Sequence, residues 1–389
     1  MAERKRLLML TSQHNPFDGR IFHLEAKALR DDGYDVFIAA EKRENYPSVV
    51  DGIRIISYRK AQGVLRKWST LKALSLIALH TKPDIIHVHE VDAPLIAASW
   101  AKRKLKNMGI GVKLVFDSHE VWPFFYAGKT GNPVLQTLIK HAVILYENLM
   151  ISRFIDGIIT AHELEKYYYK FLNPSVPVVK VIGGPPIDLW GEPPKRSGEI
   201  KIIGHDGYFT DSRGMKTILG SFELIASNHP EVNLLIAGGF RYPEDEQYFE
   251  QWCERTRLTD RVIFTGWVNR DEVMQYLDRM DIGIVANNPD IHSIRCWPAN
   301  KMMYYMARAV AVVSTPAPLY KENIARIGCG LVADSFTNKD VAVALDKLIS
   351  DPSRTRKMGK NGYKSAKIEY NGNKATEELL NFYAELNRR

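Results

Sequence analysis

Short apolar runs alternate with segments of helical periodicity along most of the chain, and no other feature restricts the fold as strongly. Within the intervening segments, apolar residues recur every three or four positions. The runs expected as strands are 7–11, 36–40, 53–57, 85–88, 113–116 and 157–160, and then 201–204, 233–237, 262–265, 282–285 and 310–314. Because strand–helix–strand units build parallel sheets with helices on both faces, the sequence predicts an α/β fold with doubly wound sheets.

A segment rich in glycine and proline divides this series near its middle. It reads Gly-Gly-Pro-Pro at 183–186 and Gly-Glu-Pro-Pro at 191–194, a composition that favours a linker. We therefore expect two Rossmann-like domains facing a cleft, at 1–184 and 199–370, joined by a linker at 185–198. The amphipathic helix expected at 371–389 precedes no strand, so it is free to join the N-terminal domain.

Cysteine usage and hydropathy indicate where such a chain works. Its cysteines, Cys253, Cys296 and Cys329, are odd in number and lack the Cys/His spacings of a zinc site, so neither a disulfide framework nor structural zinc is expected. The apolar run at 7–10 is too short for a signal peptide, and no stretch reaches the roughly 18 apolar residues of a membrane-spanning helix. These features favour a cytoplasmic location.

The net charge of +8 is not evenly spread. Residues 1–185 have 26 Lys and Arg against 18 Asp and Glu, whereas the rest of the chain is balanced at 27 each. One cluster combines basic residues with an apolar stripe at helical spacing: Arg66, Lys67 and Lys72 with Leu65, Trp68, Leu71 and Leu74. This pattern is typical of a helix lying on an anionic membrane surface, although a solvated helix face fits equally well. No nucleic-acid motif is present, so nucleic acid is not expected as a partner.

Two loops of the C-terminal half have residues suited to a phosphate group. Gly207 and Gly214 enclose the segment between its first strand and first helix, and Arg213 offers a planar set of donors there. Asn300 and Lys301 begin a later helix, where the helix N-terminus and a lysine can act on one anion. The residues alone leave a surface arginine and an ordinary capped helix as alternatives. Neither a P-loop nor a GxGxxG sequence is present.

Several motifs together resemble one enzyme family. The segment 207–214 reads G-x-x-x-x-x-R-G, and 298–306 matches most of P-x-N-K-x-x-E-Y-M. Further matches lie in the first loop and helix, at two strand ends and in a later turn: 15–26, 84–89, 117–120 and 264–268. With these motifs the chain resembles the retaining glycosyltransferases of family four over nearly its whole length. The resemblance implies the two-domain GT-B fold.

The resemblance also implies a division of roles between the two domains. Arg213 and Lys301 would neutralise the diphosphate of a nucleotide-sugar as it leaves, and His119 would contact the donor sugar. The other residues that it places at the donor or the reacting centre are Gly19, Gly207, Gly214, Gly266, Trp267, Val268, Asn300 and Tyr304. The departing phosphate would act as the base, so no cofactor and no metal ion are expected.

The activity implied is transfer of a sugar, as in hexosyltransferases, from a nucleotide diphosphate to a saccharide or lipid-linked acceptor held by the N-terminal domain. Surface polysaccharide or glycolipid assembly is the expected setting, at the inner face of the membrane. This setting follows from the resemblance and from the basic first half of the chain.

One position departs from the family. Tyr304 stands where a glutamate usually accepts hydrogen bonds from the nucleotide ribose, and Cys296 replaces an acid eight residues earlier. A catalytically silent partner subunit is therefore an alternative, and a sugar-nucleotide epimerase is a lesser one. The spacing of His87 and His89 with Glu90 and Asp92 would also suit a metal, but the family has this pattern without one.

Overall fold

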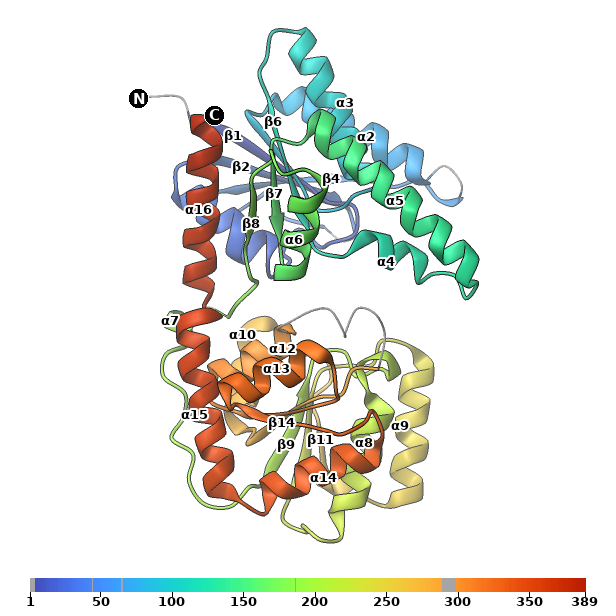
Figure 1. The fold of residues 1–389 in the computed structure, drawn as a ribbon, viewed down its shortest axis with the longest axis vertical. Coiled ribbons are helices and arrows are strands. Elements are labelled where there is room, and N and C mark those ends of the chain that lie inside the picture. Colours follow the sequence, from blue (N-terminus) through green and yellow to red (C-terminus); the bar gives the residue numbers. More distant parts are fainter. Residues whose placement is uncertain (1–3, 44, 64–65, 186, 289–298) are drawn as a thin grey trace. The chain divides into compact units, whose positions relative to one another are not determined.

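The computed structural model describes residues 4–43, 45–63, 66–185, 187–288 and 299–389. The chain forms two compact units, each with its own sheet (Figure 1). Unit 1 comprises Met1–Gly183 and Lys374–Arg389, and unit 2 comprises Gly184–Asn373.

Unit 1 is built on an eight-stranded sheet with the order β3-β4-β2-β1-β5-β6-β7-β8. Its strands are β1 (Arg6–Leu10), β2 (Asp35–Glu41), β3 (Val49–Val50), β4 (Ile53–Tyr58), β5 (Ile85–Val88), β6 (Lys113–Ser118), β7 (Gly157–Thr160) and β8 (Val178–Lys180). All neighbours pair in parallel except β3 with β4. The carboxyl ends of the parallel strands therefore share one edge, where side chains that are distant in sequence meet.

Helices cover both faces of this sheet. They are the π-helix η1 (Ile21–Ala26), α1 (Lys27–Asp31), α2 (Arg66–Thr81), α3 (Ala93–Asn107), α4 (Trp122–Ala127), α5 (Pro133–Phe154), α6 (Glu163–Leu172) and α16 (Gly372–Arg388). Leu8 and Leu10 of β1 pack with α2, α3 and α5, whereas Leu7 and Met9 pack with η1, α1 and α16. Because successive strand residues point to opposite faces, α16 covers the face opposite α2, α3 and α5 (Figure 1).

Unit 2 has a six-stranded, wholly parallel sheet with the order β11-β10-β9-β12-β13-β14. Its strands are β9 (Ile202–Asp206), β10 (Asn233–Ala237), β11 (Val262–Phe264), β12 (Ile282–Val285), β13 (Ala311–Ser314) and β14 (Gly330–Val332). The first strand, β9, lies in the middle between β10 and β12. The strand order thus reverses beside β9, which is where α/β sheets commonly bind ligands.

The helices of unit 2 are α7 (Ile187–Trp190), η3 (Asp211–Arg213), α8 (Met215–Ala226), α9 (Pro243–Thr256), η4 (Thr259–Arg261), α10 (Arg270–Arg279), α12 (Asn300–Ala307), α13 (Pro318–Ile327), α14 (Asn338–Ile349) and α15 (Pro352–Glu369). The segment 185–198 lies in this unit, and Arg308 donates hydrogen bonds to its carbonyl groups at Trp190, Gly191 and Glu192.

The α/β fold with two parallel sheets is confirmed. The sequence did not predict β3, β8, β14, α4, α6, α7, α13, α14 or α15. No helix of the described ranges is both long and apolar enough to cross a membrane.

The apolar stripe expected on the helix at 66–81 is wrong as a continuous lipid-facing surface. Leu74 is fully buried and Leu71 packs against the core, because both side chains cover the sheet of unit 1. Trp68 does point outward, with 73% of its surface exposed, while Leu65 lies outside the described residues.

Candidate functional site

The loop after β9 in unit 2 is shaped by two glycines. Gly207 and Gly214 both have positive φ angles, +85° and +82°, which side chains with a Cβ rarely adopt. A Cβ at Gly214 would also lie 1.8 Å from the carbonyl oxygen of Ala286. The backbone between β9 and α8 can therefore follow this tight course only with glycine at 214.

Arg213 lies in this loop, at the end of η3, and is exposed. Its guanidinium has no hydrogen-bond or ion-pair partner among the residues that the structure describes. Burial lowers the pKa of two nearby groups, Lys301 and His205, and the charge of Arg213 adds to this effect in both. Arg213 is therefore placed to bind an anion at the end of β9.

Lys301 is buried, with 7% of its surface exposed, on the first turn of α12. Burial lowers the pKa of Lys301 to about 7, with Asp206 opposing this effect and Arg213 adding to it. Asn300, the first residue of α12, is exposed. Pro298 and Cys296 lie outside the described residues.

Two residues at the end of β9 surround this lysine. The Nε2 atom of His205 lies 3.1 Å from the Nζ atom of Lys301. Asp206 donates its backbone N–H to the hydroxyl of Tyr305, while its Oδ1 atom is buried without a hydrogen-bond partner among the described residues. The cation expected from the sequence thus belongs to a buried polar cluster that sequence analysis did not identify.

An aromatic pair lies beside the Gly207 loop, at the ends of β9 and β11. The ring of Trp267, which is 65% exposed, lies 5.1 Å from that of Tyr208. Gly266 has a φ of +68°, and Val268 after it is half-buried. An exposed indole beside a tyrosine offers a flat apolar surface on which a planar base can stack.

Tyr304 lies on the same helix as Lys301 and packs against Trp190. The centroids of the two rings are 5.3 Å apart. The position at which the resemblance implies a glutamate is therefore occupied here by a tyrosine that contacts α7.

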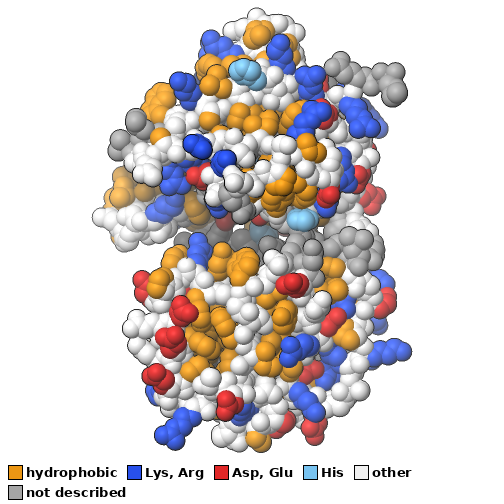
Figure 2. Space-filling model, turned by 180° about the vertical axis from the view of Figure 1, so that it is seen from behind, with side chains coloured by type: hydrophobic (Ala, Val, Ile, Leu, Met, Phe, Trp, Pro, Cys, Tyr) orange, Lys and Arg blue, Asp and Glu red, His pale blue; other side chains and the backbone are white. Residues whose placement is uncertain are grey.

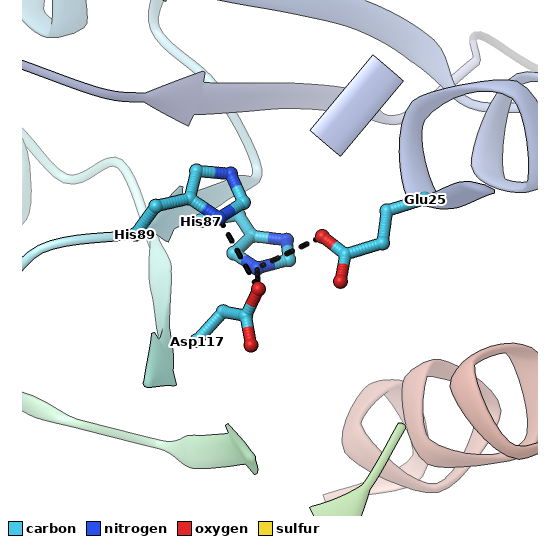
Figure 3. Close-up of side chains that lie close together, drawn as sticks. All are labelled: Glu25, His87, His89 and Asp117. Carbon is cyan, nitrogen blue, oxygen red and sulfur yellow. Dashed lines mark hydrogen bonds and ion pairs between the residues drawn. The ribbon is translucent and has the colours of Figure 1, made fainter. Parts of the chain in front are cut away.

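In unit 1 the carboxyl ends of β5 and β6 meet η1 around a group of buried polar side chains. Figure 3 shows Glu25, His87, His89 and Asp117 pointing toward one another. His89 donates from Nδ1 to Asp117 over 3.2 Å, and the hydroxyl of Tyr383 on α16 bonds His87 over 2.8 Å. The cluster therefore joins η1, two strands and the C-terminal helix.

These four side chains lie close enough together to hold a metal ion, but a cation already stands among them. Arg20 donates two hydrogen bonds to Asp117, of 2.8 and 3.1 Å, and its Nε atom lies 2.9 Å from Glu25. A second cation there would be repelled by the guanidinium. Burial and then the charge of Asp117 raise the pKa of Glu25 well above its usual value, so Asp117 is the principal counterion of Arg20.

His119 is held at the rim of this cluster. Its Nε2 atom lies 2.7 Å from Asp117, and 13% of its side chain is exposed. Burial opposes ionisation of Asp117, but the charge of Arg20 and the contact with His119 hold its pKa well below the usual value. The centroid of the His14 ring lies 4.9 Å from that of the His119 ring. The loop containing Gly19 leads directly into Arg20 and η1.

Glu90 does not join His87 and His89, although the spacing of these residues in the sequence would suit a metal site. Glu90 accepts hydrogen bonds from Thr11, Ser12 and Gln13 after β1, so its carboxylate serves that loop instead of the histidines. Glu90 thus follows β5 in the sequence but stabilises the loop that follows β1.

Comparisons with known proteins indicate the family of this chain. Residues 191–365 match the family model described as glycosyl transferases group 1, and residues 19–176 match that of glycosyltransferase family 4. A putative glycosyltransferase of Bacillus subtilis, YtcC, is 24% identical over 190 residues, which are 47% of this chain and 45% of that relative. This match thus spans less than half of that relative's length. An uncharacterized glycosyltransferase of the same organism, YqgM, is 19% identical over 79% of this chain and 80% of its own.

Solved structures share the fold over nearly the full length. Sucrose-phosphate synthase from Thermosynechococcus elongatus superposes with a TM-score of 0.75 at 17% identity, covering 98% of this chain and 99% of that one. HepE of Anabaena, solved with UDP and glucose, gives 0.73 at 13% identity, covering 98% and 100%. At these identities the likeness establishes the fold alone.

Proposed function

Because this chain is a glycosyltransferase of the group 1 type, we propose that it transfers a sugar, with retention of configuration, from a nucleotide diphosphate donor held by unit 2. The observation that carries the proposal is the pair Arg213 and Lys301. Both cations act at the end of β9, beside a loop whose glycines allow close approach of the backbone. An arginine and a lysine at such a loop suit a diphosphate leaving group.

Most of the expected site residues have a role in this proposal. The Tyr208 and Trp267 rings, with the Gly266 turn, would stack the base, and Asn300 would begin the helix whose N-terminus faces the phosphates. In unit 1, His119 would contact the donor sugar, and the loop at Gly19 would let the backbone approach the reacting centre. Charge stabilisation comes from the two cations, so the proposal involves no metal ion.

The acceptor class proposed is a saccharide or a lipid-linked saccharide, used in surface polysaccharide or glycolipid assembly. HepE, which shares the fold, was solved with UDP-glucose, which supports a nucleotide-sugar donor for this chain. A hexosyl group is the sugar proposed.

A first test compares a nucleotide with its nucleoside. UDP, ADP and GDP are screened by thermal shift, and the tightest binder is titrated calorimetrically beside its nucleoside. We expect Arg213→Ala to weaken binding of the diphosphate about 10- to 100-fold, because a charge-assisted hydrogen bond contributes roughly 1.5–3 kcal/mol, and to leave the nucleoside unchanged. Arg255→Ala removes an exposed arginine of the same unit and is the matched control.

Equal losses for nucleotide and nucleoside would contradict the assignment of Arg213. Diphosphate binding without transfer or hydrolysis across a panel of nucleotide-sugars would instead favour the silent partner subunit. In that case the contact of Tyr304 with Trp190 would mark a donor site that has lost turnover.

We also propose that unit 1 meets an anionic membrane through α2 and α3. A groove between them is lined mainly by apolar side chains, among them Trp68, Leu76, Ile96 and Trp100. Lys72 lines the same groove, and the ammonium of Lys104 lies 5.6 Å from the Trp100 ring. Exposed indoles beside lysines fit the interface of an anionic bilayer.

The distribution of charged side chains over the two units also suits an anionic membrane on unit 1. In Figure 2, Lys and Arg side chains lie among hydrophobic ones on unit 1, whereas acidic side chains are more frequent on unit 2. Arg66 and Lys67, at the start of α2, are exposed next to Trp68. This arrangement supports attachment at the membrane's inner face from a cytoplasmic location.

Sedimentation with liposomes tests the membrane proposal. We expect salt-sensitive binding to vesicles of phosphatidylglycerol and phosphatidylcholine that falls more than tenfold in the double variant Lys67→Glu/Lys72→Glu. Each basic residue near the surface contributes about 1 kcal/mol. Lys339→Glu/Lys347→Glu makes the same charge change on α14 and should bind as the parent does. Unchanged binding by the α2 variant would rule this surface out.

A further inference from the structure

Two nitrogen bases form a buried pair at the end of β9. His205 is fully buried, Lys301 is nearly so, and their Nε2 and Nζ atoms lie 3.1 Å apart. Among the described residues, His205 is the one hydrogen-bond partner of this lysine. Two positive charges at this distance away from water would repel strongly, so at most one of the two side chains is charged.

The packing of α12 fixes the lysine in this position. The ring of Tyr305 lies flat on Gly283 of β12, where an added Cβ would come within 2.4 Å of it. Lys301 precedes Tyr305 by one helical turn, so both side chains leave the same face of α12 toward the end of β9. The pair is therefore built into the fold of unit 2.

The neighbours of His205 restrict where its proton can lie. Its Nε2 atom is also 3.3 Å from the carbonyl oxygen of Tyr208. A protonated Nε2 can donate to this carbonyl or to the lone pair of a neutral lysine amine. An unprotonated Nε2 can accept from an ammonium group but then faces the carbonyl oxygen with a lone pair. The contact with Tyr208 thus favours a neutral Lys301 in the free protein, and the backbone of Ile284 is a second acceptor for the ring.

The surrounding charges act in both directions. Among the described residues, Asp206 of β9 favours the ammonium form of Lys301, and Arg213 of η3 disfavours it. The strands against which α12 packs, β12 and β13, have no ionisable side chain. The helix α15 approaches α12 through Gly362 and Met306. Burial is the largest effect, and it lowers the pKa of Lys301 to about 7.

We propose that binding of the donor diphosphate is coupled to uptake of one proton by Lys301, with His205 as the positioning residue that keeps the amine neutral beforehand. The proton passes from solvent to Nζ, and no other bond is made or broken. A diphosphate beside Nζ would favour the ammonium form by adding opposite charge. The inference rests on the proposed function, since it takes the diphosphate as the ligand of unit 2.

Calorimetry in two buffers measures the coupling directly. The tightest binder among UDP, ADP and GDP is titrated at pH 8 in HEPES and in Tris, whose heats of ionisation differ. With the lysine pKa at about 7, we expect uptake of about 0.9 proton per bound nucleotide, and a Kd that rises about eightfold from pH 7.5 to 8.5. The terminal phosphate, whose pKa is near 6, is already ionised there.

Two variants separate the coupling from a structural role. His205→Gln offers an amide that donates to Tyr208 and a carbonyl that accepts from an ammonium, so Lys301 stays charged and uptake should fall below half. Lys301→Arg cannot lose its charge and should bind without uptake. His229→Gln removes a histidine paired with Asp346 on the same unit, and uptake should stay at the parent value.

The outcomes are distinct. Tight binding at pH 8 without proton uptake, or the same uptake in parent and His205→Gln proteins, overturns the coupling and leaves the proposed function intact. Failure of all three nucleotides to bind at pH 6 and pH 8 overturns the proposed function itself.

Discussion

Asp117→Asn should lower the free energy of unfolding of unit 1 by about 3 kcal/mol, because it removes the principal counterion of a buried arginine. Asp117 is fully buried and accepts two hydrogen bonds from Arg20 and one each from His119 and His89. The value lies at the lower end for broken buried pairs, since Glu25 can ionise in its place once the neighbouring charge is gone. Guanidinium denaturation followed by fluorescence measures the change.

An exposed ion pair in the same unit supplies the control. Asp31, with 67% of its side chain exposed, lies 2.7 Å from Arg30, and Asp31→Asn should change stability by less than about 0.5 kcal/mol. If the Asp117→Asn protein proved as stable as the Asp31→Asn protein, the buried carboxylate would not be holding Arg20. Because the pKa of Asp117 is depressed, its contribution is present above the unfolded pKa and is lost only as pH falls through the lower folded value.

His119→Ala should reduce kcat about 100-fold and leave nucleotide affinity unchanged. His119 belongs to unit 1, whereas the proposed diphosphate ligands belong to unit 2. Removing a single group that stabilises charge in a transition state typically costs 10²–10³ in rate. Steady-state kinetics with the donor found by screening, together with calorimetry of the nucleotide, separate kcat from binding.

The matched control is His141→Ala, because His141 is exposed on α5 and bonds only the Thr137 carbonyl of its own helix among the contacts described. We expect its kcat to stay within twofold of the parent. A His119→Ala protein that loses nucleotide binding along with turnover would indicate a role in folding. A variant with full activity would remove His119 from the site.

The sequence predicted most strands and helices of both units, because the period of apolar residues is a local property. The strands expected at 85–88 and 233–237 lie at β5 and β10. Local chemistry also singled out Gly207 and Gly214, whose positive φ angles in the loop after β9 suit glycine.

The partners of buried polar groups could not be predicted in the same way. Lys301 was expected to act on a phosphate, but its neighbour His205 lies 96 residues earlier and meets it only because β9 and β12 pair in the sheet. Glu25 and His87 lie inside apolar segments, which hints that both are buried. The sequence does not indicate which side chains they contact.

What the sequence by itself determined is which residues share a face or begin a turn, and hence the α/β fold, the two sheets and the phosphate-binding candidates. The tertiary structure decided what each face touches. It turned Leu74 of α2 into the core, left Leu71 partly buried and Trp68 outside, and brought Tyr383 of the last helix to His87, 296 residues away. The reason is that periodicity fixes direction relative to a helix or strand axis, whereas strand order and helix packing fix which side chains lie opposite.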